Sequence, residues 1–139
     1  MKIDALTDED EVAVVALWSE VGLTRPWNDA AADFRRALAG PTSTVFGATS
    51  ENGSVGAVMV GHDGHRGWVY YLSVRTDEQH RGVGAALMAA AEEWLRARCC
   101  VKVQLMVRRD NDLARSFYDR MGYEVSDVTV HARWLEPRP

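Results

Sequence analysis

The strongest structural signal in this chain is the stretch YYLSVRTDEQHRGVGAAL, which covers residues 70–87. Its apolar start predicts a buried strand that ends at Val74, its polar middle predicts a turn, and Gly82 and Gly84 mark the opening of a helix. The first amides of a helix have no partner within the helix, and a glycine backbone lets a ligand approach closely. Because the helix dipole and the cationic Arg81 both favour an anion there, the pattern predicts a phosphate or diphosphate site.

Two other glycine-rich phosphate sites are excluded by the residues that follow Gly84. A P-loop needs Lys followed by Ser or Thr at that point, but the chain has Ala85 and Ala86. A dinucleotide fingerprint needs a third glycine where Leu87 stands, with an acidic residue about 20 positions further on. A third interpretation, in which the two glycines only permit a tight strand-to-helix connection, stays open at this stage.

Two motifs, in this order, resemble those of the GNAT superfamily of N-acetyltransferases. The run Gln79-His80-Arg81-Gly82-Val83-Gly84 after an apolar strand resembles motif A. Asn111 to Tyr118, with the Met121-Gly122-Tyr123 that follows, resembles motif B. The length and the order of elements are similar to the superfamily over essentially the whole chain. Residues 25–29 and 61–67 also resemble the bacterial YpeA-type branch.

The pattern and the resemblance together imply a single domain over residues 1–139 with an α+β fold, in the broad α/β class. The GNAT acyltransferase fold would be a mixed, mostly antiparallel sheet of six to seven strands flanked by four helices. The pattern predicts strands over residues 2–6, 43–50, 54–62, 68–74, 102–107, 123–125 and 128–135, and helices over residues 8–21, 30–38, 82–98 and 112–121. Strands 68–74 and 102–107 are expected to be parallel neighbours, and the resemblance implies that they splay apart.

The resemblance implies that the phosphate site holds acetyl-CoA as cosubstrate, with no metal ion. Backbone groups of Leu72, Ser73 and Val74 would pair with the pantetheine arm, and the amide near Leu72 would face the thioester oxygen. The diphosphate would bind the amides of Arg81, Gly82, Val83, Gly84 and Ala85, with side-chain contacts from Gln79, His80 and Arg81.

The second motif contributes two further residues, again by resemblance. Asn111 would contact the cofactor arm, and Tyr118 would act as general acid by giving its phenolic proton to the departing CoA thiolate. The two residues with catalytic roles are thus Tyr118 and Leu72. An alternative for Tyr118 is a core aromatic beside Phe117, because both lie on one helix and one of them must face inward.

The implied function is that of an acetyl-CoA-dependent N-acetyltransferase, which moves an acetyl group to a primary amine by direct transfer in a ternary complex. The acceptor can be a small molecule or a protein amine. The alternative is a non-catalytic domain that binds or senses CoA or its esters, and a nucleotide-binding regulator would rest on the glycine turn alone. The presence of Tyr118 and of both glycines favours the enzyme.

Five residues are candidates for the acceptor side of the site: Arg25, Trp27, Asp63, His65 and Tyr71. In the GNAT layout the first two helices flank the acceptor, so the loop with Arg25 and Trp27 would lie beside it. Trp27 could equally fill the edge of the core while Arg25 pairs with an acid. Asp63, His65 and Tyr71 are the polar groups near the start of the cofactor strand, but the loop that carries Asp63 and His65 could also be a solvated hairpin tip. No general base is assigned, because water could carry the proton of the amine.

Length and composition are those of one soluble globular domain. The 139 residues are 47% hydrophobic and 26% charged, and no apolar run approaches the ~20 residues of a membrane span. The start of the chain has no apolar stretch of signal-peptide type, which predicts a cytoplasmic protein without a membrane partner. The net charge of -4 argues against nucleic-acid binding and is compatible with a cationic amine substrate.

Two further features concern covalent links and assembly. Cys99 and Cys100 are adjacent, and neighbouring cysteines rarely reach disulfide geometry, nor do they have the spacing of a metal clamp. An exposed C-terminal strand with Val128, Val130 and Trp134 could pair with a second copy of the chain, which would give a homodimer.

Overall fold

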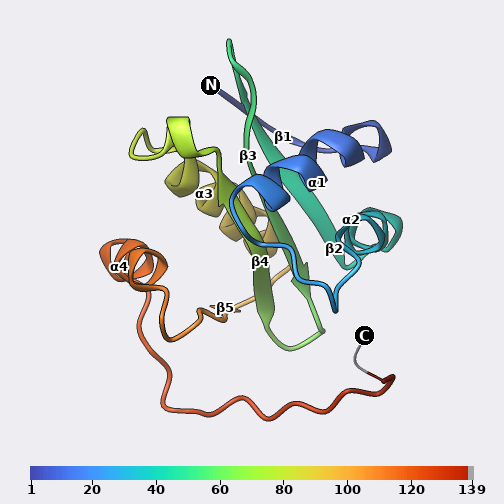
Figure 1. The fold of residues 1–139 in the computed structure, drawn as a ribbon. Coiled ribbons are helices and arrows are strands. Elements are labelled where there is room, and N and C mark those ends of the chain that lie inside the picture. Colours follow the sequence, from blue (N-terminus) through green and yellow to red (C-terminus); the bar gives the residue numbers. More distant parts are fainter. Residues whose placement is uncertain (138–139) are drawn as a thin grey trace. The chain divides into compact units, whose positions relative to one another are not determined.

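The computed structural model describes residues 1–137 of the chain. The chain divides into two compact units, Met1–Leu105 and Met106–Pro139. Within the described residues, the first unit contains every strand and the helices α1, α2 and α3, while the second contains α4 (Figure 1).

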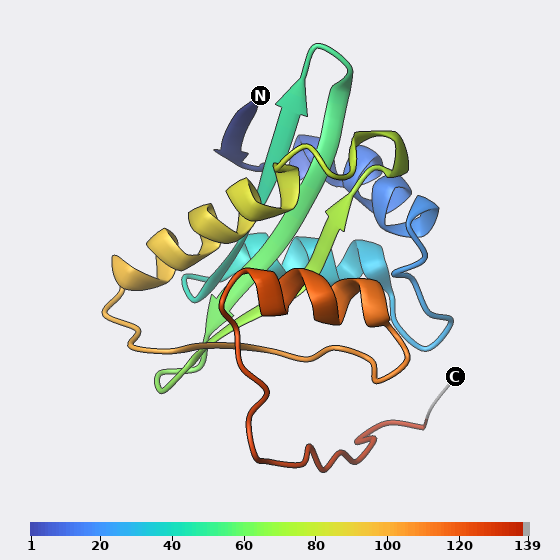
Figure 2. The same ribbon diagram turned by 90° about the vertical axis from the view of Figure 1, so that its left-hand side faces the viewer.

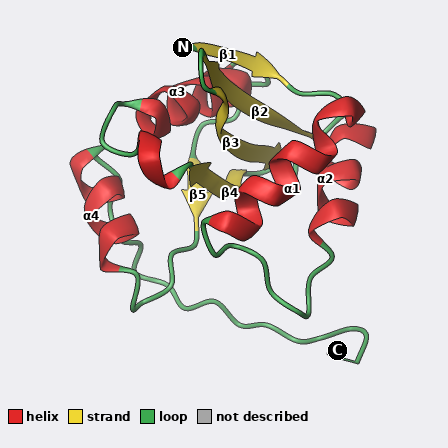
Figure 3. Cartoon of the chain, turned by 45° about the horizontal axis from the view of Figure 1, so that its top comes forward, coloured by secondary structure: helices red, strands yellow, loops and turns green. Residues whose placement is uncertain are grey.

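The first unit is built on a five-stranded sheet in the order β1-β2-β3-β4-β5. The strands, drawn in yellow in Figure 3, are β1 Lys2–Ala5, β2 Ser43–Ser50, β3 Gly53–His62, β4 Gly67–Val74 and β5 Val103–Leu105. All neighbours are antiparallel except β4 and β5, which are parallel, as predicted for two strands that a helix connects. The predicted α+β fold with a mixed sheet is therefore confirmed.

The prediction of six to seven strands is wrong for the described part of the chain. Within residues 1–137 five strands form, and the segments 123–125 and 128–135 have no strand structure. Their β-branched residues favour strands, but a strand is stable only when it pairs in a sheet, and neither segment joins a ladder. The strand predicted over residues 102–107 is shorter than expected, because its pairing with β4 covers only Val103–Leu105.

Helices cover both faces of the sheet in the first unit. Figure 2 shows α1 Glu11–Glu20 and α2 Ala30–Ala39 on one face and α3 Val83–Arg96 on the other. Asp29 caps α2, since its side chain accepts a 3.0 Å hydrogen bond from the amide of Ala32. None of the helices within residues 1–137 combines the length and the apolar composition that a bilayer crossing needs.

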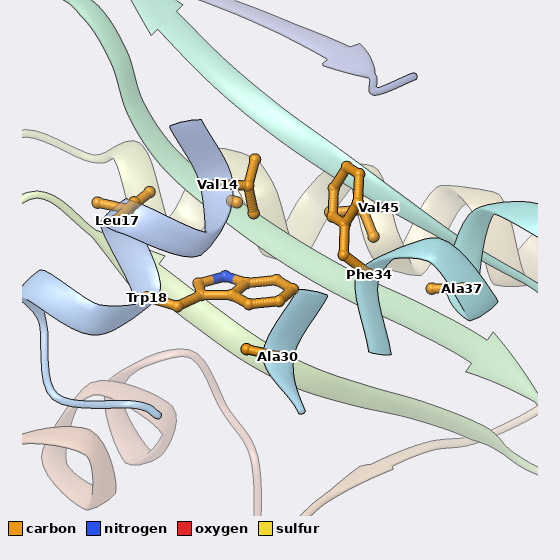
Figure 4. Close-up of a cluster of buried hydrophobic side chains, with 8 residues drawn as sticks. Val14, Leu17, Trp18, Ala30, Phe34, Ala37 and Val45 are labelled. Carbon is orange, nitrogen blue, oxygen red and sulfur yellow. The ribbon is translucent and has the colours of Figure 1, made fainter. Parts of the chain in front are cut away.

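A cluster of buried side chains fills the space between the sheet and the first two helices (Figure 4). Trp18 and Phe34 pack edge to face, with ring centroids 6.2 Å apart. The cluster consists of Val14, Leu17, Trp18, Ala30, Phe34, Ala37, Val45 and Ala57. In α1 the buried residues are Val14, Leu17 and Trp18, and Val12 lies on the other side of the helix and is 81% exposed.

The opposite face of the sheet packs against α3. The sequence pattern of α3 favours Leu87, Met88, Ala91, Trp94 and Leu95 as its inward residues, and all are buried except Trp94, which is half-buried. Gly67 lets α3 approach β4 closely, because a Cβ at this position would lie 2.5 Å from a methyl carbon of Leu95. This close packing fixes α3 against β4, the strand that leads into the predicted phosphate site.

The second unit contains the helix α4 Asp112–Arg120. Asn111 is its N-cap, because Asn111 Oδ1 accepts a 3.1 Å hydrogen bond from the amide of Ala114. Gly122, with φ 87°, ends the helix in the left-handed conformation. Both helix ends agree with the sequence prediction.

Candidate active site

The opening of α3 presents a set of backbone amides without partners in the helix. The first intrahelical hydrogen bond runs from the Ala86 amide to the Gly82 carbonyl (3.0 Å), so the amides of Val83, Gly84 and Ala85 have no acceptor within α3. Gly82 is the N-cap in the left-handed conformation (φ 84°), and it supplies no side-chain cap. No acidic residue occupies the first turn of α3. This end of the helix therefore favours an anion.

The side chains ahead of α3 take different positions in the turn. Gln79 reaches back to β4, where its Nε2 donates a 3.3 Å hydrogen bond to the Val74 carbonyl. His80 is exposed and has a positive φ of 65°. The Arg81 side chain is also largely exposed, with one guanidinium nitrogen 3.5 Å from Glu78 Oε2. His80 and Arg81 are thus accessible to an anionic ligand. The Gln79 side chain instead links the turn to the end of β4.

Behind this turn lies a buried carboxylate, Glu78, which is 6% exposed. Asn52 Nδ2 donates a 2.9 Å hydrogen bond to Glu78 Oε1, and Arg75 Nη2 lies 3.6 Å from the same oxygen. Arg75 also donates to the Asn52 carbonyl (2.9 Å), which closes a small network between the β2–β3 hairpin and the turn. The network compensates the buried charge and holds the turn in place.

β4 leaves one side open along its second half. It pairs with β5 only through Gly67, Trp68 and Val69, and within residues 1–105 no strand follows on that side from Tyr70 to Val74. An extended ligand can add to such an edge through main-chain hydrogen bonds. The open segment contains the predicted cofactor contacts Leu72, Ser73 and Val74. The side chain of Ser73 is buried, and its hydroxyl donates a 3.2 Å hydrogen bond to the Ala57 carbonyl of β3.

A bulge interrupts β4 within this open segment. Met59 pairs with Tyr70 and Ala57 with Ser73, so the two residues Tyr71 and Leu72 lie opposite the single residue Val58. Tyr71 has φ 56°, in a region that bulky side chains rarely adopt. The bulge changes the direction of the backbone amides near Leu72, where the resemblance implies the thioester contact.

Two contacts hold Tyr71 on the face of the sheet that α1 and α2 cover. Its ring stacks on Trp18 of α1, with centroids 4.0 Å apart and an interplanar angle of 14°. Its hydroxyl donates a 2.8 Å hydrogen bond to Asp33 Oδ2 of α2. Burial, followed by the hydrogen bond to Asp33, raises the pKa of the Tyr71 phenol well above its ordinary value. Tyr71 therefore keeps its proton and acts as a donor.

The other acceptor-side candidates lie at two separate places in the first unit. Arg25 Nη1 donates to the carbonyls of Gly22 (2.8 Å) and Thr24 (2.9 Å), so it stabilises its own loop rather than pairing with an acid. Trp27, two residues further on, is half-buried. Asp63 and His65 lie in the β3–β4 hairpin, before the start of β4, whereas the phosphate turn follows its end.

Asp63 organises that hairpin. Its Oδ1 accepts hydrogen bonds from the amides of His65 (2.9 Å) and Arg66 (2.7 Å), and its Oδ2 accepts one from Trp68 Nε1 (3.2 Å). The hydrogen bonds from the Arg66 and His65 amides are the main causes that lower the pKa of Asp63 to about 2. Asp63 is therefore ionised at neutral pH and is a weak proton acceptor.

In the second unit, the two predicted residues Asn111 and Tyr118 lie at opposite ends of α4. Asn111 uses its side-chain oxygen for the helix cap. The Tyr118 ring packs edge to face on Phe117 and on Tyr123, with centroid distances of 5.0 Å and 5.6 Å. Burial raises the pKa of the Tyr118 phenol to about 12. Tyr118 therefore carries a proton at neutral pH, as a general acid must.

Sequence reasoning missed two residues of this region, Asp33 and Glu78. Neither acidic residue belongs to a local motif, and each makes its contact with a residue distant in the chain. Only the fold brings these partners together. Within residues 1–137 no group of three or more His, Cys, Asp or Glu side chains could hold a metal ion.

Comparison with known proteins agrees with this geometry. A sequence profile described as the acetyltransferase (GNAT) family matches residues 6–123. An acetyltransferase of Pectobacterium atrosepticum is 41% identical over 139 residues, which is 99% of each chain.

Solved structures of acetyltransferases share the fold. The aminoglycoside acetyltransferase AAC(6')-Iy, in complex with a bisubstrate analogue of CoA, has a TM-score of 0.83 at 15% identity and covers 96% of this chain and 97% of its own. An aminoglycoside acetyltransferase from an uncultured soil metagenomic sample, in complex with sisomicin, has a TM-score of 0.81 at 20% identity, with 98% and 96% covered.

Proposed function

The chain belongs to the acetyltransferase (GNAT) family, and on this basis we propose that it transfers the acetyl group of acetyl-CoA to a primary amine. It is thus an N-acetyltransferase by family. The observation that carries the proposal is the row of amides at Val83, Gly84 and Ala85 that have no acceptor within α3 and that follow, after one turn, a strand with an open edge in the first unit. We propose that both units form one acetyltransferase domain, which is supported by a profile match that runs across their boundary.

Acetyl-CoA would bind along β4 and the start of α3. The diphosphate would accept hydrogen bonds from the amides between Arg81 and Ala85, with His80 and Arg81 contributing positive or polar contacts. The pantetheine arm would pair with the backbone of Leu72 to Val74, as an additional strand does. Two observations support this placement. Both features adjoin one turn, residues 75–82, and a solved structure that shares the fold binds a bisubstrate analogue of CoA.

Catalysis would proceed by direct transfer while both substrates are bound. The amine nitrogen attacks the thioester carbon, and the Leu72 amide stabilises the negative charge that develops on the thioester oxygen. As the carbon–sulfur bond breaks, Tyr118 gives its phenolic proton to the sulfur. The proton of the amine passes to water, and water returns a proton to Tyr118. The raised pKa of Tyr118 supports this role, because the proton stays on the phenol until the thiolate develops.

The acceptor would be an amine that carries or can carry positive charge. The net charge of -4 supports this, since it favours the approach of cations. One of the solved structures that share the fold binds an aminoglycoside. Aminoglycosides are therefore one class of amine to be tested, and they are not inferred to be the substrate.

An acceptor screen tests the proposal directly. Acetyl-CoA is incubated with the protein and a panel of polyamines, aminoglycosides, amino acids and peptides, and release of free CoA thiol is measured. We expect thiol release that depends on both the protein and the amine. Binding of acetyl-CoA without release over the whole panel would instead favour the non-catalytic sensor, and absence of binding would contradict both.

A further inference from the structure

We propose that Asp33 is a positioning residue for acetyl transfer, because it holds Tyr71 and thereby fixes the β4 bulge that presents the Leu72 amide. This inference rests on the proposed function and adds a residue of α2 to it. Asp33 is not expected to contact acetyl-CoA or to move a proton. Its effect would be transmitted through one hydrogen bond to Tyr71.

The bulge needs support because its backbone is strained. Of the three non-glycine residues with positive φ in residues 1–137, Tyr71 alone lies within a strand. A bulky residue adopts such a conformation only where its surroundings enforce it. Without the extra residue, each residue after Tyr71 would turn to the other face of the sheet, and the Leu72 amide would take another direction.

Two side chains enforce the conformation of Tyr71. Trp18, which is fully buried, lies parallel to the Tyr71 ring at 4.0 Å, and Asp33 accepts the hydrogen bond of the hydroxyl at 2.8 Å. The buried Trp18 Nε1 has no hydrogen-bond partner among the described residues, so the indole acts here through its ring. The stack fixes the plane of the Tyr71 ring, and Asp33 fixes the position of its far end.

The hydrogen bond from Tyr71 requires an acceptor oxygen on the side chain at position 33 of α2. It does not require that this side chain be charged. An asparagine in place of Asp33 would keep such an oxygen, so Asp33→Asn is expected to preserve the hydrogen bond, whereas Asp33→Ala and Tyr71→Phe remove it. If Asp33 instead acted as a base, or bound an ammonium group through its charge, Asp33→Asn would lose that role just as Asp33→Ala does. The three variants therefore separate positioning from charge.

A matched control is available on the same helix. Arg35, two residues along α2, pairs with Glu11 of α1 at 2.6 Å. Arg35→Ala removes a polar contact between α1 and α2 and leaves both Asp33 and Tyr71 unchanged. Any general loosening of α2 would appear in this variant too.

The test measures the polarisation of the bound thioester, which needs no acceptor. Acetyl-CoA labelled with carbon-13 at the carbonyl is bound to the wild type and the variants, and the carbonyl band is recorded by difference infrared spectroscopy. Affinity is measured by calorimetry on the same samples. In the wild type we expect the band to lie below its frequency in free acetyl-CoA, because the Leu72 amide polarises the carbonyl.

In Asp33→Ala and Tyr71→Phe we expect at least about half of that band shift to be lost, with the dissociation constant of acetyl-CoA within about twofold of wild type. Asp33→Asn and Arg35→Ala should keep the wild-type band. A full shift in both Asp33→Ala and Tyr71→Phe would overturn the inference, as would its loss in Asp33→Asn or Arg35→Ala. Both substitutions that remove the contact are at half-buried positions, and circular dichroism verifies that each variant is folded.

Failure of the proposed function gives a different result. If wild-type protein does not bind acetyl-CoA, the proposed function fails and this inference fails with it. If acetyl-CoA binds and its carbonyl band is the same in wild type, Asp33→Ala and Tyr71→Phe, the positioning role alone is contradicted.

Discussion

Asn52, at the tip of the β2–β3 hairpin, donates a 2.9 Å hydrogen bond to Glu78, the buried carboxylate at the base of the phosphate turn. The two residues are 26 positions apart in the chain. Glu78 is 6% exposed and close to Arg75 and Arg81, so its charge is compensated by groups that also shape the turn. The hairpin therefore supports the place where we propose that the diphosphate binds.

Asn52→Ala is expected to lower the free energy of unfolding by about 1–2 kcal/mol, because a buried carboxylate loses its neutral donor. It should also weaken binding of acetyl-CoA more than binding of acetyl-pantetheine, which lacks the diphosphate. Urea denaturation and calorimetry measure the two effects. Ser50→Ala is the control, since it removes the 3.1 Å hydrogen bond that Ser50 Oγ accepts from the Asn52 amide and leaves Glu78 unchanged. Equal loss of affinity for both ligands would argue against a role at the diphosphate.

Gly82→Ala should cost about 1–2 kcal/mol of stability, because alanine is strained at φ 84°. A Cβ at this position meets open space, so the cost is conformational rather than steric. Affinity for CoA should fall as well, since the altered N-cap displaces the amides at the start of α3. Gly64→Ala is matched in strain, with φ 87° and open space, and should lose stability while binding CoA as wild type does. Unchanged CoA affinity in Gly82→Ala, measured by calorimetry, would contradict the assigned anion site.

Tyr118→Phe is expected to reduce kcat by about 10²-fold with little change in acetyl-CoA affinity, because it removes a proton donor and keeps the ring. A general acid is active while protonated, and its contribution is lost as the pH rises through its pKa. With that pKa raised to about 12, wild-type kcat should show no basic decline due to Tyr118 between about pH 7 and 10. A wild-type kcat in Tyr118→Phe would disprove the role as general acid, whereas a basic limb in that range that disappears in Tyr118→Phe would contradict the raised pKa.

Asp63→Asn should lower the melting temperature at neutral pH, because the turn hydrogen bonds prefer a carboxylate. The pKa of Asp63 is depressed in the folded protein to about 2, from an ordinary 3.8, so its contribution to stability is present above the ordinary value. That contribution is lost as the pH falls through the folded pKa. The difference in melting temperature between wild type and variant should therefore be largest above about pH 5 and shrink between about pH 4 and 2. A difference that stays constant to pH 2 would refute this role of the charge.

The parts of the molecule that the sequence predicts well depend on local signals. Gly82 and Gly84 locate the start of α3, Asn111 caps α4, and Gly122 ends it, and in each case the residue type itself sets the backbone conformation. The parallel pairing of β4 and β5 follows from their connection through one helix.

The parts that the sequence misses depend on contacts between distant residues. Tyr71 and Asp33 are 38 positions apart, and no turn residue marks the bulge at Tyr71. The alternation of Val128 and Val130 is typical of a strand, but the pattern cannot supply the neighbouring strand that would pair with it. The homodimer, the cytoplasmic location and the relation to the YpeA-type branch stay predictions.

In the function that we propose, the open edge of β4 and the first amides of α3 together hold one CoA molecule. A crystal structure of the protein with CoA is the decisive measurement. We predict the diphosphate within hydrogen-bond distance of the amides of Val83, Gly84 and Ala85, and the pantetheine arm paired with the backbone of Leu72 to Val74. CoA bound at any other place, or a turn whose amides are occupied by the protein's own side chains, would contradict this placement.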